Sequence, residues 1–376
     1  MTIDSALLGL IAPLLPEIEQ RTDATAAELG IALAADAIPI VLLALPIGRA
    51  VDRVGSRWLL IGGILLIAAG SAVIAVTSSL EVLVAGRVLQ GIGSSMSWIS
   101  ALTIVSDLAP PDKRGESIGV AFAAIGVGSI AGPTLGGVAA DVISYAAPFL
   151  IVCALSVAVA AVGFVVLPRE RRAEPSETPA LRAIARSAGS RKGAIATSMT
   201  LGAALVLGTL ELVVPLDLDA RLGLSAAAIG VLFGGSIAVD SAIAPIGGRW
   251  GDRRGRRWPA VLGFATLGAS ALALAALGGV GGAAAGMALF GAGLSLAFAA
   301  AVPWLDEAFG ELERGLGYGV LNLLYASGYA LGPVVGGVLL SVGSADLAYY
   351  LTAAALAAGT VALLRATASM TTAPSS

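Results

Sequence analysis

The 376-residue sequence contains no histidine and a single cysteine, Cys153. Without histidine the chain lacks the commonest metal ligand and the usual proton carrier near neutral pH, which excludes a histidine-based metal centre or nucleophile. One cysteine cannot form a disulfide within the chain. The sequence also has no GxxxxGK[ST] phosphate-binding loop, which excludes an ATPase of that type. We therefore expect neither an enzyme nor a bound cofactor or metal.

Charge is scarce as well. Charged residues make up 12% of the chain, about half the share in a soluble protein, whereas apolar residues make up 57% and the mean hydropathy is +0.92. About 20 apolar residues cross the roughly 30 Å hydrocarbon core of a bilayer. We therefore predict an all-α polytopic membrane protein with twelve spans, at residues 1–17, 28–48, 58–78, 81–106, 116–140, 145–167, 194–217, 226–248, 258–278, 280–304, 315–341 and 346–366.

The basic residues are unevenly distributed between the loops. All of the 22 Lys and Arg except Arg21, Arg87 and Arg221 fall in alternate connections, starting with the loop after the second span, or near the C-terminus. Positive residues mark the cytoplasmic side of a membrane. The distribution predicts a multi-pass protein of the plasma (inner) membrane with both termini in the cytoplasm. It also argues against a nucleic-acid partner, because these residues do not form one folded basic face.

The first predicted span is shorter than the others and has no basic flank. Aligning Pro13 with Pro215 of the seventh span leaves roughly ten residues without a counterpart at the N-terminus. We therefore expect the natural start of the protein to lie upstream of Met1.

The sequence repeats itself at an offset of 200 residues, a feature to be sought before a fold is argued. GRAVDRVGSRW at 48–58 returns as GRWGDRRGRRW at 248–258, so that Gly48, Asp52, Arg53, Gly55 and Arg57 recur as Gly248, Asp252, Arg253, Gly255 and Arg257. In the fifth and eleventh spans, Gly128, Gly132, Pro133, Gly136 and Gly137 recur as Gly328, Gly332, Pro333, Gly336 and Gly337. Two six-helix halves in the same orientation form a parallel repeat. We predict an N-terminal bundle at 1–167, a cytoplasmic linker at 168–193 and a C-terminal bundle at 194–376.

These repeated motifs resemble the major facilitator superfamily of transporters. The pattern Gly-x-x-x-Asp-Arg-x-Gly-x-Arg is similar to its signature loop, RVLQGIG at 87–93 to its fourth-helix motif, and GVAFAAIGVGSIAGPTLGG at 119–137 to its antiporter motif. Within the superfamily, LLGLIAPLLPEI, LELVVPL and GYALGP resemble drug:proton antiporters and vesicular amine transporters. The sequence departs from the amine transporters at Asp36, where they carry a lysine, and at Asn322 and Phe298, where they carry acids.

The resemblance implies a role for the repeated loops. It implies that their aspartates pair with arginines across helix–helix gaps, between spans 2 and 11 and between spans 8 and 5, and so clamp the outward-facing state. The alternative is a topological anchor with incidental acids. The repeated glycines allow close helix packing, and the Gly-Pro pairs allow the helices to bend. Both features suit either a hinge between moving helices or static packing.

Five ionisable residues fall inside predicted spans, where each costs about 2.5–3.5 kcal/mol on insertion scales; they are Asp4, Asp36, Arg87, Glu211 and Asp240. At 1.5 Å per residue, Asp36, Arg87 and Glu211 lie at the same depth in the membrane. Asp4 and Asp240 lie deeper. Arg87 cannot readily lose its charge and needs an acid; Asp36 is its first candidate and Asp4 its second, a purely structural pair being the alternative.

The remaining acids are candidate proton carriers, because a desolvated carboxylate without a partner can load and release protons near neutral pH. Glu211 is the leading candidate, since LELVVPL resembles the segment that carries the seventh-helix acid of the amine transporters. For Asp240 the alternative is a water-filled crevice without a role. Aromatic residues that could line a substrate cavity are Trp98, Phe122, Phe233, Phe298, Trp304 and Tyr325.

Surplus carboxylate in an apolar cavity suits a lipophilic cation. The sequence thus predicts a proton-coupled antiporter that exports lipophilic or cationic small molecules, uses the proton gradient instead of a cofactor, and works as a monomer in the lipid bilayer. The alternatives are a metabolite importer of the same fold, either symporter or facilitator, and a sensor or partner protein that does not transport.

Overall fold

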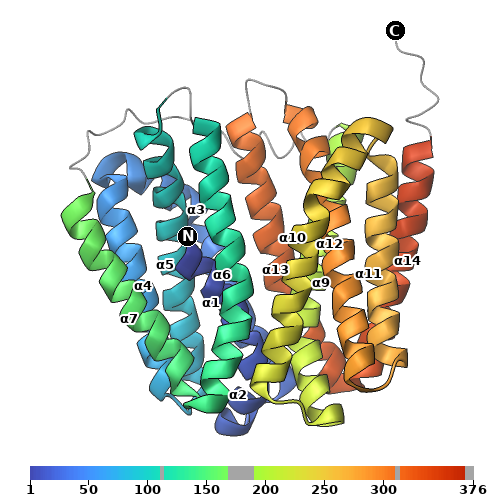
Figure 1. Cartoon of the computed structure of the whole chain (residues 1–376), viewed down its shortest axis with the longest axis horizontal. Coiled ribbons are helices and arrows are strands. Elements are labelled where there is room, and N and C mark those ends of the chain that lie inside the picture. The colour runs from blue at the N-terminus through green and yellow to red at the C-terminus, as the bar shows by residue number, and fades with distance from the viewer. Residues whose placement is uncertain (111–113, 168–189, 310–313, 369–376) are drawn as a thin grey trace. The chain divides into compact units, whose positions relative to one another are not determined.

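The computed structural model describes residues 1–110, 114–167, 190–309 and 314–368, and almost all of these are helical (Figure 1). The helices are α1 (Thr2–Leu10), the 3-10 turn η1 (Ala12–Leu14), α2 (Leu15–Thr22), α3 (Ala26–Val54), α4 (Ser56–Val76), α5 (Leu80–Leu108), α6 (Arg114–Val142), α7 (Ala146–Val166), α9 (Arg191–Leu222), α10 (Ala226–Arg254), α11 (Arg257–Ala276), α12 (Gly279–Phe309), α13 (Arg314–Val342) and α14 (Ala345–Ala368).

Eleven helices in the described part of the chain are long and apolar enough to cross a membrane. They coincide with every predicted span except the first, which confirms the all-α polytopic fold. Residues 1–17 instead form α1, η1 and the start of α2. Pro13 and Pro16 account for this break, because proline lacks an N–H group and its ring clashes with the preceding helical turn. The count of twelve spans stays a prediction.

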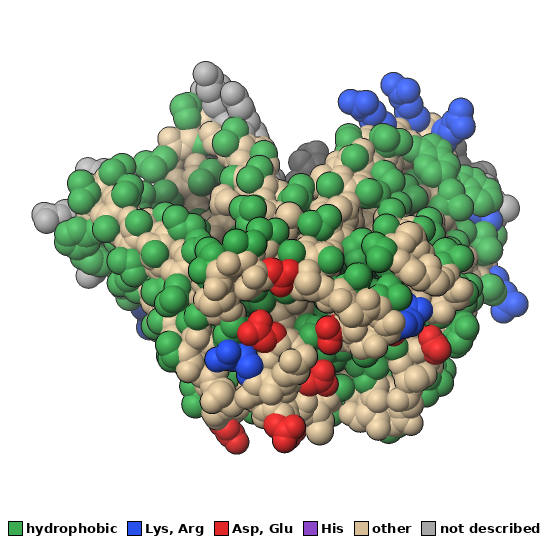
Figure 2. Space-filling view, turned by 60° about the horizontal axis from the view of Figure 1, so that its bottom comes forward, with side chains coloured by type: hydrophobic (Ala, Val, Ile, Leu, Met, Phe, Trp, Pro, Cys, Tyr) green, Lys and Arg blue, Asp and Glu red, His purple; other side chains and the backbone are tan. Residues whose placement is uncertain are grey.

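The exterior of the helices is apolar, as a lipid environment requires. Helix α7 has a mean hydropathy of 2.9, yet only 22% of it is buried. Val157, Phe164 and Val165 are 49%, 56% and 81% exposed. Figure 2 shows green hydrophobic side chains over the flanks and few charged ones among them. The chain is therefore a multi-pass membrane protein whose exposed apolar surface faces lipid.

Contacts divide the chain into two compact units, which are described separately. The first holds residues 1–177 and 218–234, and the second holds 178–217 and 235–376. In the first unit α5 packs against α3 and α4, and α4 packs against α7; in the second, α11 packs against α12 and α14. Most of the predicted linker, residues 168–189, lies outside the described part of the chain. The predicted domain boundaries stay a prediction.

The repeated glycines bring paired helices into backbone contact in each unit. A Cβ atom at Gly132 would collide with the Ala6 carbonyl of α1, and one at Gly332 with the Leu205 carbonyl of α9. The same close approach to backbone is made at Gly128 of the first unit and at Gly328 and Gly336 of the second, whereas a Cβ atom at Gly136 would meet the Leu10 side chain. Small residues at these positions allow the van der Waals contact that holds helices together in lipid. A hinge at these glycines stays a prediction.

Contacts of Pro133 and Pro333 show which residues of α1 and α9 correspond to each other in the repeat. A Cβ atom at Gly9 would lie 2.8 Å from Pro133 Cδ, and one at Gly208 would lie 2.7 Å from Pro333 Cδ. Gly9 and Gly208 are therefore counterparts at an offset of 199, whereas the alignment of Pro13 with Pro215 assumes an offset of 202. The three-residue difference falls just after Gly9, where α1 gives way to η1.

Two motif glycines are needed for their backbone conformation. Helix α3 is followed by Gly55 with φ of 97°, and α10 is followed by Gly255 with φ of 83°. Residues with a Cβ atom rarely adopt positive φ, so glycine at these places lets each long helix turn sharply into the next one.

The glycine contacts can be tested within one helix. We expect Gly132→Ala to destabilise the protein by about 1–3 kcal/mol, the usual cost of overpacking, because the new methyl group meets backbone that cannot move aside. Thermal unfolding of purified protein in detergent measures this. Gly126→Ala on the same helix is the control, since no atom lies within 4 Å of its added Cβ. Equal melting temperatures for the two variants would contradict this explanation.

Candidate functional site

A buried ion pair lies in the first unit. Arg87 Nη2 of α5 is 3.2 Å from Asp36 Oδ2 of α3, and both side chains are 1% exposed. Arg87 Nη1 also donates to Gln90 Oε1 at 3.0 Å, and Gln90 Nε2 donates to Ser71 Oγ of α4 at 3.0 Å. Gly91 lets the two helices approach, because a Cβ there would collide with the Asp36 carbonyl. The pairing expected from depth is present and extends into a chain of polar side chains across three helices.

Asp4 of α1 is a second buried carboxylate of the first unit. It is 4% exposed, and Ser97 Oγ of α5 donates to its Oδ1 at 2.7 Å. The amino group of Met1 lies 3.4 Å from its other oxygen. Of the two buried acids of the first unit, Asp36 therefore has Arg87 as its cation, whereas Asp4 is contacted by Ser97 and by the Met1 amino group.

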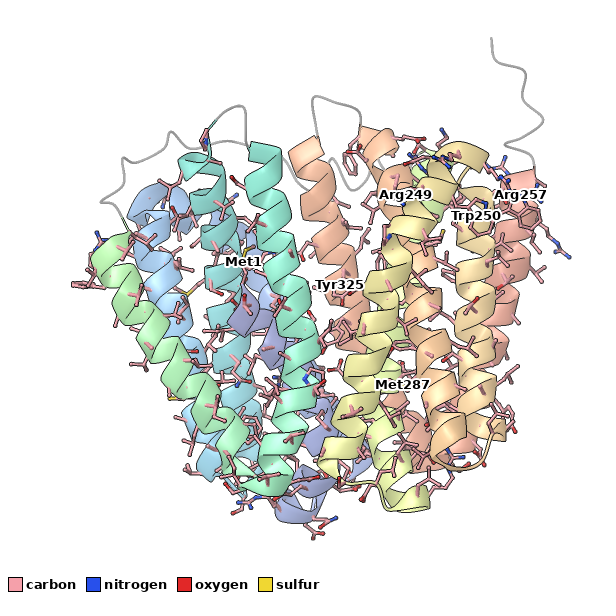
Figure 3. All side chains as sticks on the ribbon, in the orientation of Figure 1. Met1, Arg249, Trp250, Arg257, Met287 and Tyr325 are labelled. Carbon is pink, nitrogen blue, oxygen red and sulfur yellow. The ribbon has the colours of Figure 1, made fainter. Side chains whose placement is uncertain are left out.

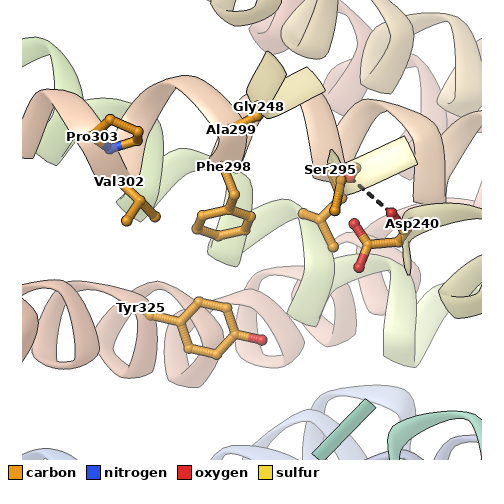
Figure 4. Close-up of a pocket in the computed structure, with 10 residues that line it drawn as sticks. Asp240, Gly248, Ser295, Phe298, Ala299, Val302, Pro303 and Tyr325 are labelled. Carbon is orange, nitrogen blue, oxygen red and sulfur yellow. Dashed lines mark hydrogen bonds between the residues drawn. The ribbon is translucent and has the colours of Figure 1, made fainter. Parts of the chain in front are cut away.

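The second unit contains a cavity of about 510 Å³ with an acid in its wall. Asp240 of α10 lines it together with Ser295 and Phe298 of α12 and Tyr325 of α13 (Figure 4). Ser295 Oγ donates to the backbone carbonyl of Asp240 at 2.9 Å. Within the described ranges Asp240 has no ion-pair partner.

The side chains of Phe298 and Tyr325 form an aromatic wall of the same cavity. The rings of Phe298 and Tyr325 are 5.9 Å apart and tilted by 49°, and those of Tyr325 and Tyr329 are 6.2 Å apart and nearly parallel. Glu211 of α9 is 5% exposed and does not line the cavity. The two candidate acids of this unit, Asp240 and Glu211, therefore differ in their access to the cavity.

The ion pair of the first unit has no equivalent in the second. A Cβ at Gly291 would collide with the Ser236 carbonyl, as one at Gly91 collides with the Asp36 carbonyl. Ser236 thus occupies the position of Asp36, and Met287, labelled in Figure 3, occupies that of Arg87. The repeated helix packing forms with or without the charges. The pair is therefore a specific property of the first unit and is not required by the fold.

The sequence matches the Major Facilitator Superfamily over residues 1–210 and 194–375, which together cover nearly the whole chain. The chain belongs to this superfamily. It is therefore placed among membrane transporters and not among enzymes.

Individual relatives match shorter segments. The class C tetracycline resistance protein of Escherichia coli is 32% identical over 159 residues, which are 42% of this chain and 40% of that protein. Quinolone resistance protein NorA of Staphylococcus aureus is 28% identical over 150 residues, 40% of this chain and 38% of that protein. The MFS-type transporter ppzB of Metarhizium rileyi is 38% identical over 140 residues, 36% and 29% of the two chains. These matches span less than half the length of each curated relative.

Solved facilitator structures share the fold along almost the whole chain. A bacterial homologue of the human lysosomal transporter Spinster, in an inward-facing and unoccupied conformation, aligns with a TM-score of 0.82 at 17% identity over 98% of this chain and 93% of its own. The nucleoside transporter NupG aligns with a TM-score of 0.78 at 13% identity, over 97% and 96% of the two chains. At such identities the likeness shows the fold alone.

The facilitator signature loop of the second unit joins a local charge network. Arg256 lies 3.9 Å from Asp252 and pairs with Glu307 of α12. Lys192 Nζ of α9 is 2.7 Å from the other oxygen of Glu307. In the first unit Arg57 Nη2 donates to the Phe164 carbonyl of α7. The Asp52 side chain lies outside what the structure describes, and the clamp to other helices stays a prediction.

Several site residues were not predicted from the sequence. Gln90 and Ser97 bind the charged side chains of Arg87 and Asp4. Ser71 accepts from Gln90, and Ser295 donates to the backbone carbonyl of Asp240. Glu307 pairs with Arg256 of the loop network. Gln90 could have been found, because it lies three residues after Arg87 and thus on the same helix face. The serines gave no signal, since serine is common in transmembrane helices. Of the candidate aromatic residues, Phe298 and Tyr325 line the cavity, and the Phe122 side chain is outside the described set.

The repeat supplies a direct test of the ion pair. We expect Arg87→Met, which copies Met287, to destabilise the protein by about 3–5 kcal/mol, because it leaves Asp36 buried without its cation. Adding Asp36→Ser, which copies Ser236, is expected to restore most of the melting temperature measured in detergent. If the double variant is no more stable than Arg87→Met alone, the two residues do not act as a pair.

Proposed function

We propose that this protein is a proton-coupled antiporter of the plasma membrane that exports lipophilic or cationic small molecules by alternating access. The observation that carries the proposal is the cavity of the second unit, where Asp240 faces an aromatic wall and has no ion-pair partner within the described residues. Relatives named for tetracycline and quinolone resistance support the same substrate class.

In this proposal a proton and the exported cation compete for the Asp240 carboxylate. This competition couples proton entry to cation export. A carboxylate surrounded by apolar groups is stabilised either by a proton or by a cation, because an uncompensated charge there is costly. With a cation bound, the ring faces of Phe298 and Tyr325 add a cation–π attraction. When a proton arrives, Asp240 becomes neutral and the cation loses its counter-charge. Alternating exposure of the cavity to the two sides then converts the proton gradient into export.

The other buried charges take supporting roles. Glu211 is buried in the same unit as Asp240, and we assign it a second proton. In the first unit Arg87 compensates Asp36, and we assign a further proton to Asp4. Each coupling residue predicted from the sequence thus has a role in the proposal. Asp240 is assigned the main role, and Glu211 a secondary one, because only Asp240 of the two lines the cavity.

The remaining features of the proposal come from the sequence. The arginine-rich loops face the cytoplasm, as do both termini, and the loop aspartates clamp the outward-facing state. The glycine–proline pairs of α6 and α13 allow these helices to bend. The proton gradient is the energy source, no cofactor takes part, and one chain suffices for transport.

Everted vesicles provide the test. After acid loading, we expect a lipophilic cation such as tetraphenylphosphonium to release protons, detected with a pH-sensitive dye. Asp240→Asn is expected to abolish this release and Glu211→Gln to reduce it severalfold. Asp346→Asn is the control, because this acid is exposed at the start of α14.

The outcomes separate the candidate functions. Release that survives both substitutions would keep antiport and move coupling to Asp4 or Asp36. Cation uptake into right-side-out vesicles would indicate an importer. No response to cations or neutral drugs, from folded protein, would favour a protein that does not transport.

The aromatic wall gives a separate prediction. We expect Tyr325→Ala to weaken binding of tetraphenylphosphonium by roughly 3- to 30-fold, the range of a desolvated cation–π contact, and to affect a neutral drug of similar size less. Equilibrium binding to purified protein measures both. Tyr350→Ala, on the exposed side of α14, controls for loss of a tyrosine. Equal weakening for the neutral drug would show that the ring contributes shape and not charge recognition.

A further inference from the structure

The arginine-rich loop of the second unit carries more charge than its local acids balance. Five arginines and one aspartate lie between Gly248 and Trp258. Arg256 is balanced, since it pairs with Asp252 and with Glu307. Arg249, Arg253 and Arg254 are exposed, and none of them has an ion pair with any described residue. Three guanidinium groups therefore lie together at one end of the unit without a counter-charge from this part of the protein.

A fourth guanidinium group borders the same surface. Arg257 lies over the Trp258 ring at 5.4 Å, and its Nε atom is buried without a hydrogen-bond acceptor among the described residues. Figure 3 shows Arg249 and Arg257 at the same end of the unit. Helix α11, which starts at Arg257, has no side-chain cap on its first turn, so its free N–H groups add to the positive potential.

The first unit uses its equivalent residues differently. Arg57, the counterpart of Arg257, is 9% exposed, contacts the rings of both Trp58 and Phe164 and donates to the Phe164 carbonyl. Val54 stands where the second unit has Arg254. Orientation in the membrane needs only basic residues in both loops. It does not account for the additional arginine of the second unit, Arg254, or for the greater exposure of Arg257 compared with Arg57.

An apolar stripe begins beside Arg257 and runs along α11. Trp258, Leu262 and Leu272 are 47%, 38% and 47% exposed, and their spacing places them on one face of the helix. A phosphate group at the arginines would thus be continuous with acyl chains along the stripe. A free phosphate or a nucleic acid would use the charges and leave the apolar surface unexplained.

We propose that this surface, formed by Arg249, Arg253, Arg254, Arg257 and the exposed face of α11 from Trp258 to Leu272, binds an anionic phospholipid. Guanidinium groups match phosphate oxygens in geometry and charge. Basic residues next to a transmembrane helix gain about 1 kcal/mol each from anionic lipid. The site is separate from the transport cavity, and its existence does not depend on the proposed substrate.

Native mass spectrometry of the purified full-length chain tests the site. We expect dioleoyl-phosphatidylglycerol and cardiolipin to remain bound, and dioleoyl-phosphatidylcholine to be lost. Arg254→Gln with Arg257→Gln is expected to weaken phosphatidylglycerol binding roughly 30-fold, as about 1 kcal/mol for each of two arginines implies. The matched control is Arg49→Gln with Arg53→Gln, which removes two exposed arginines from the first unit and is expected to change binding less than threefold.

Three outcomes would overturn the proposal. Equal weakening in both double variants would mean diffuse attraction to basic loops and no site. Retention of phosphatidylcholine to the same extent as phosphatidylglycerol would remove the role of charge. Displacement of the lipid by millimolar inorganic phosphate would identify a free-phosphate site instead. Size-exclusion profiles and melting temperatures matching the unmodified protein establish that each variant is folded, and Arg254→Gln alone, an exposed change, gives a second measurement if Arg257→Gln unfolds.

Discussion

A charge inside hydrocarbon must be compensated within the protein, and this constraint organises the buried part of the structure. In the first unit the constraint is met by a cation, since Arg87 pairs with Asp36 and connects onward to Gln90. In the second unit, Asp240 lines a cavity and has no such cation among the described residues. The same helix packing therefore holds a closed ion pair in one unit and an acid open to a ligand in the other. That difference is the physical basis for assigning charge recognition to the second unit.

Glycine contacts make this comparison possible. Gly91 and Gly291 bring equivalent helices together at Asp36 and Ser236, so the residues at these positions can be compared directly. Because the helix contacts are repeated, each unit serves as a reference for the other. The second unit shows the same helix contact with Ser236 and Met287 in place of Asp36 and Arg87. The surface differs in the same way, since Arg57 is buried against the rings of Trp58 and Phe164 whereas Arg257, over the Trp258 ring, is more exposed. Equivalent positions that differ in sequence, although the helix contacts around them are the same, are thus the positions where the two units differ in chemistry.

Much of this could be predicted from the sequence. Apolar run lengths located eleven spanning helices, and helical rise placed Arg87 level with Asp36. The break in the first span was missed because run length counts Pro13 and Pro16 as apolar residues and ignores their effect on the backbone. Depth could not distinguish Asp240 from Glu211 as cavity residues, since depth along a helix says nothing of the face a side chain takes. Partners such as Ser295 and Glu307 depend on tertiary packing that no local pattern encodes.

The central claim is that a proton and a cation compete for Asp240. The most direct measurement is the number of protons released when tetraphenylphosphonium binds to purified protein in weakly buffered detergent solution, followed with a pH indicator at several pH values. The account predicts release of about one proton per bound cation at pH values where the acid is protonated, and no release from Asp240→Asn. Cation binding without proton release at every pH, or release that is unchanged in Asp240→Asn, would contradict it.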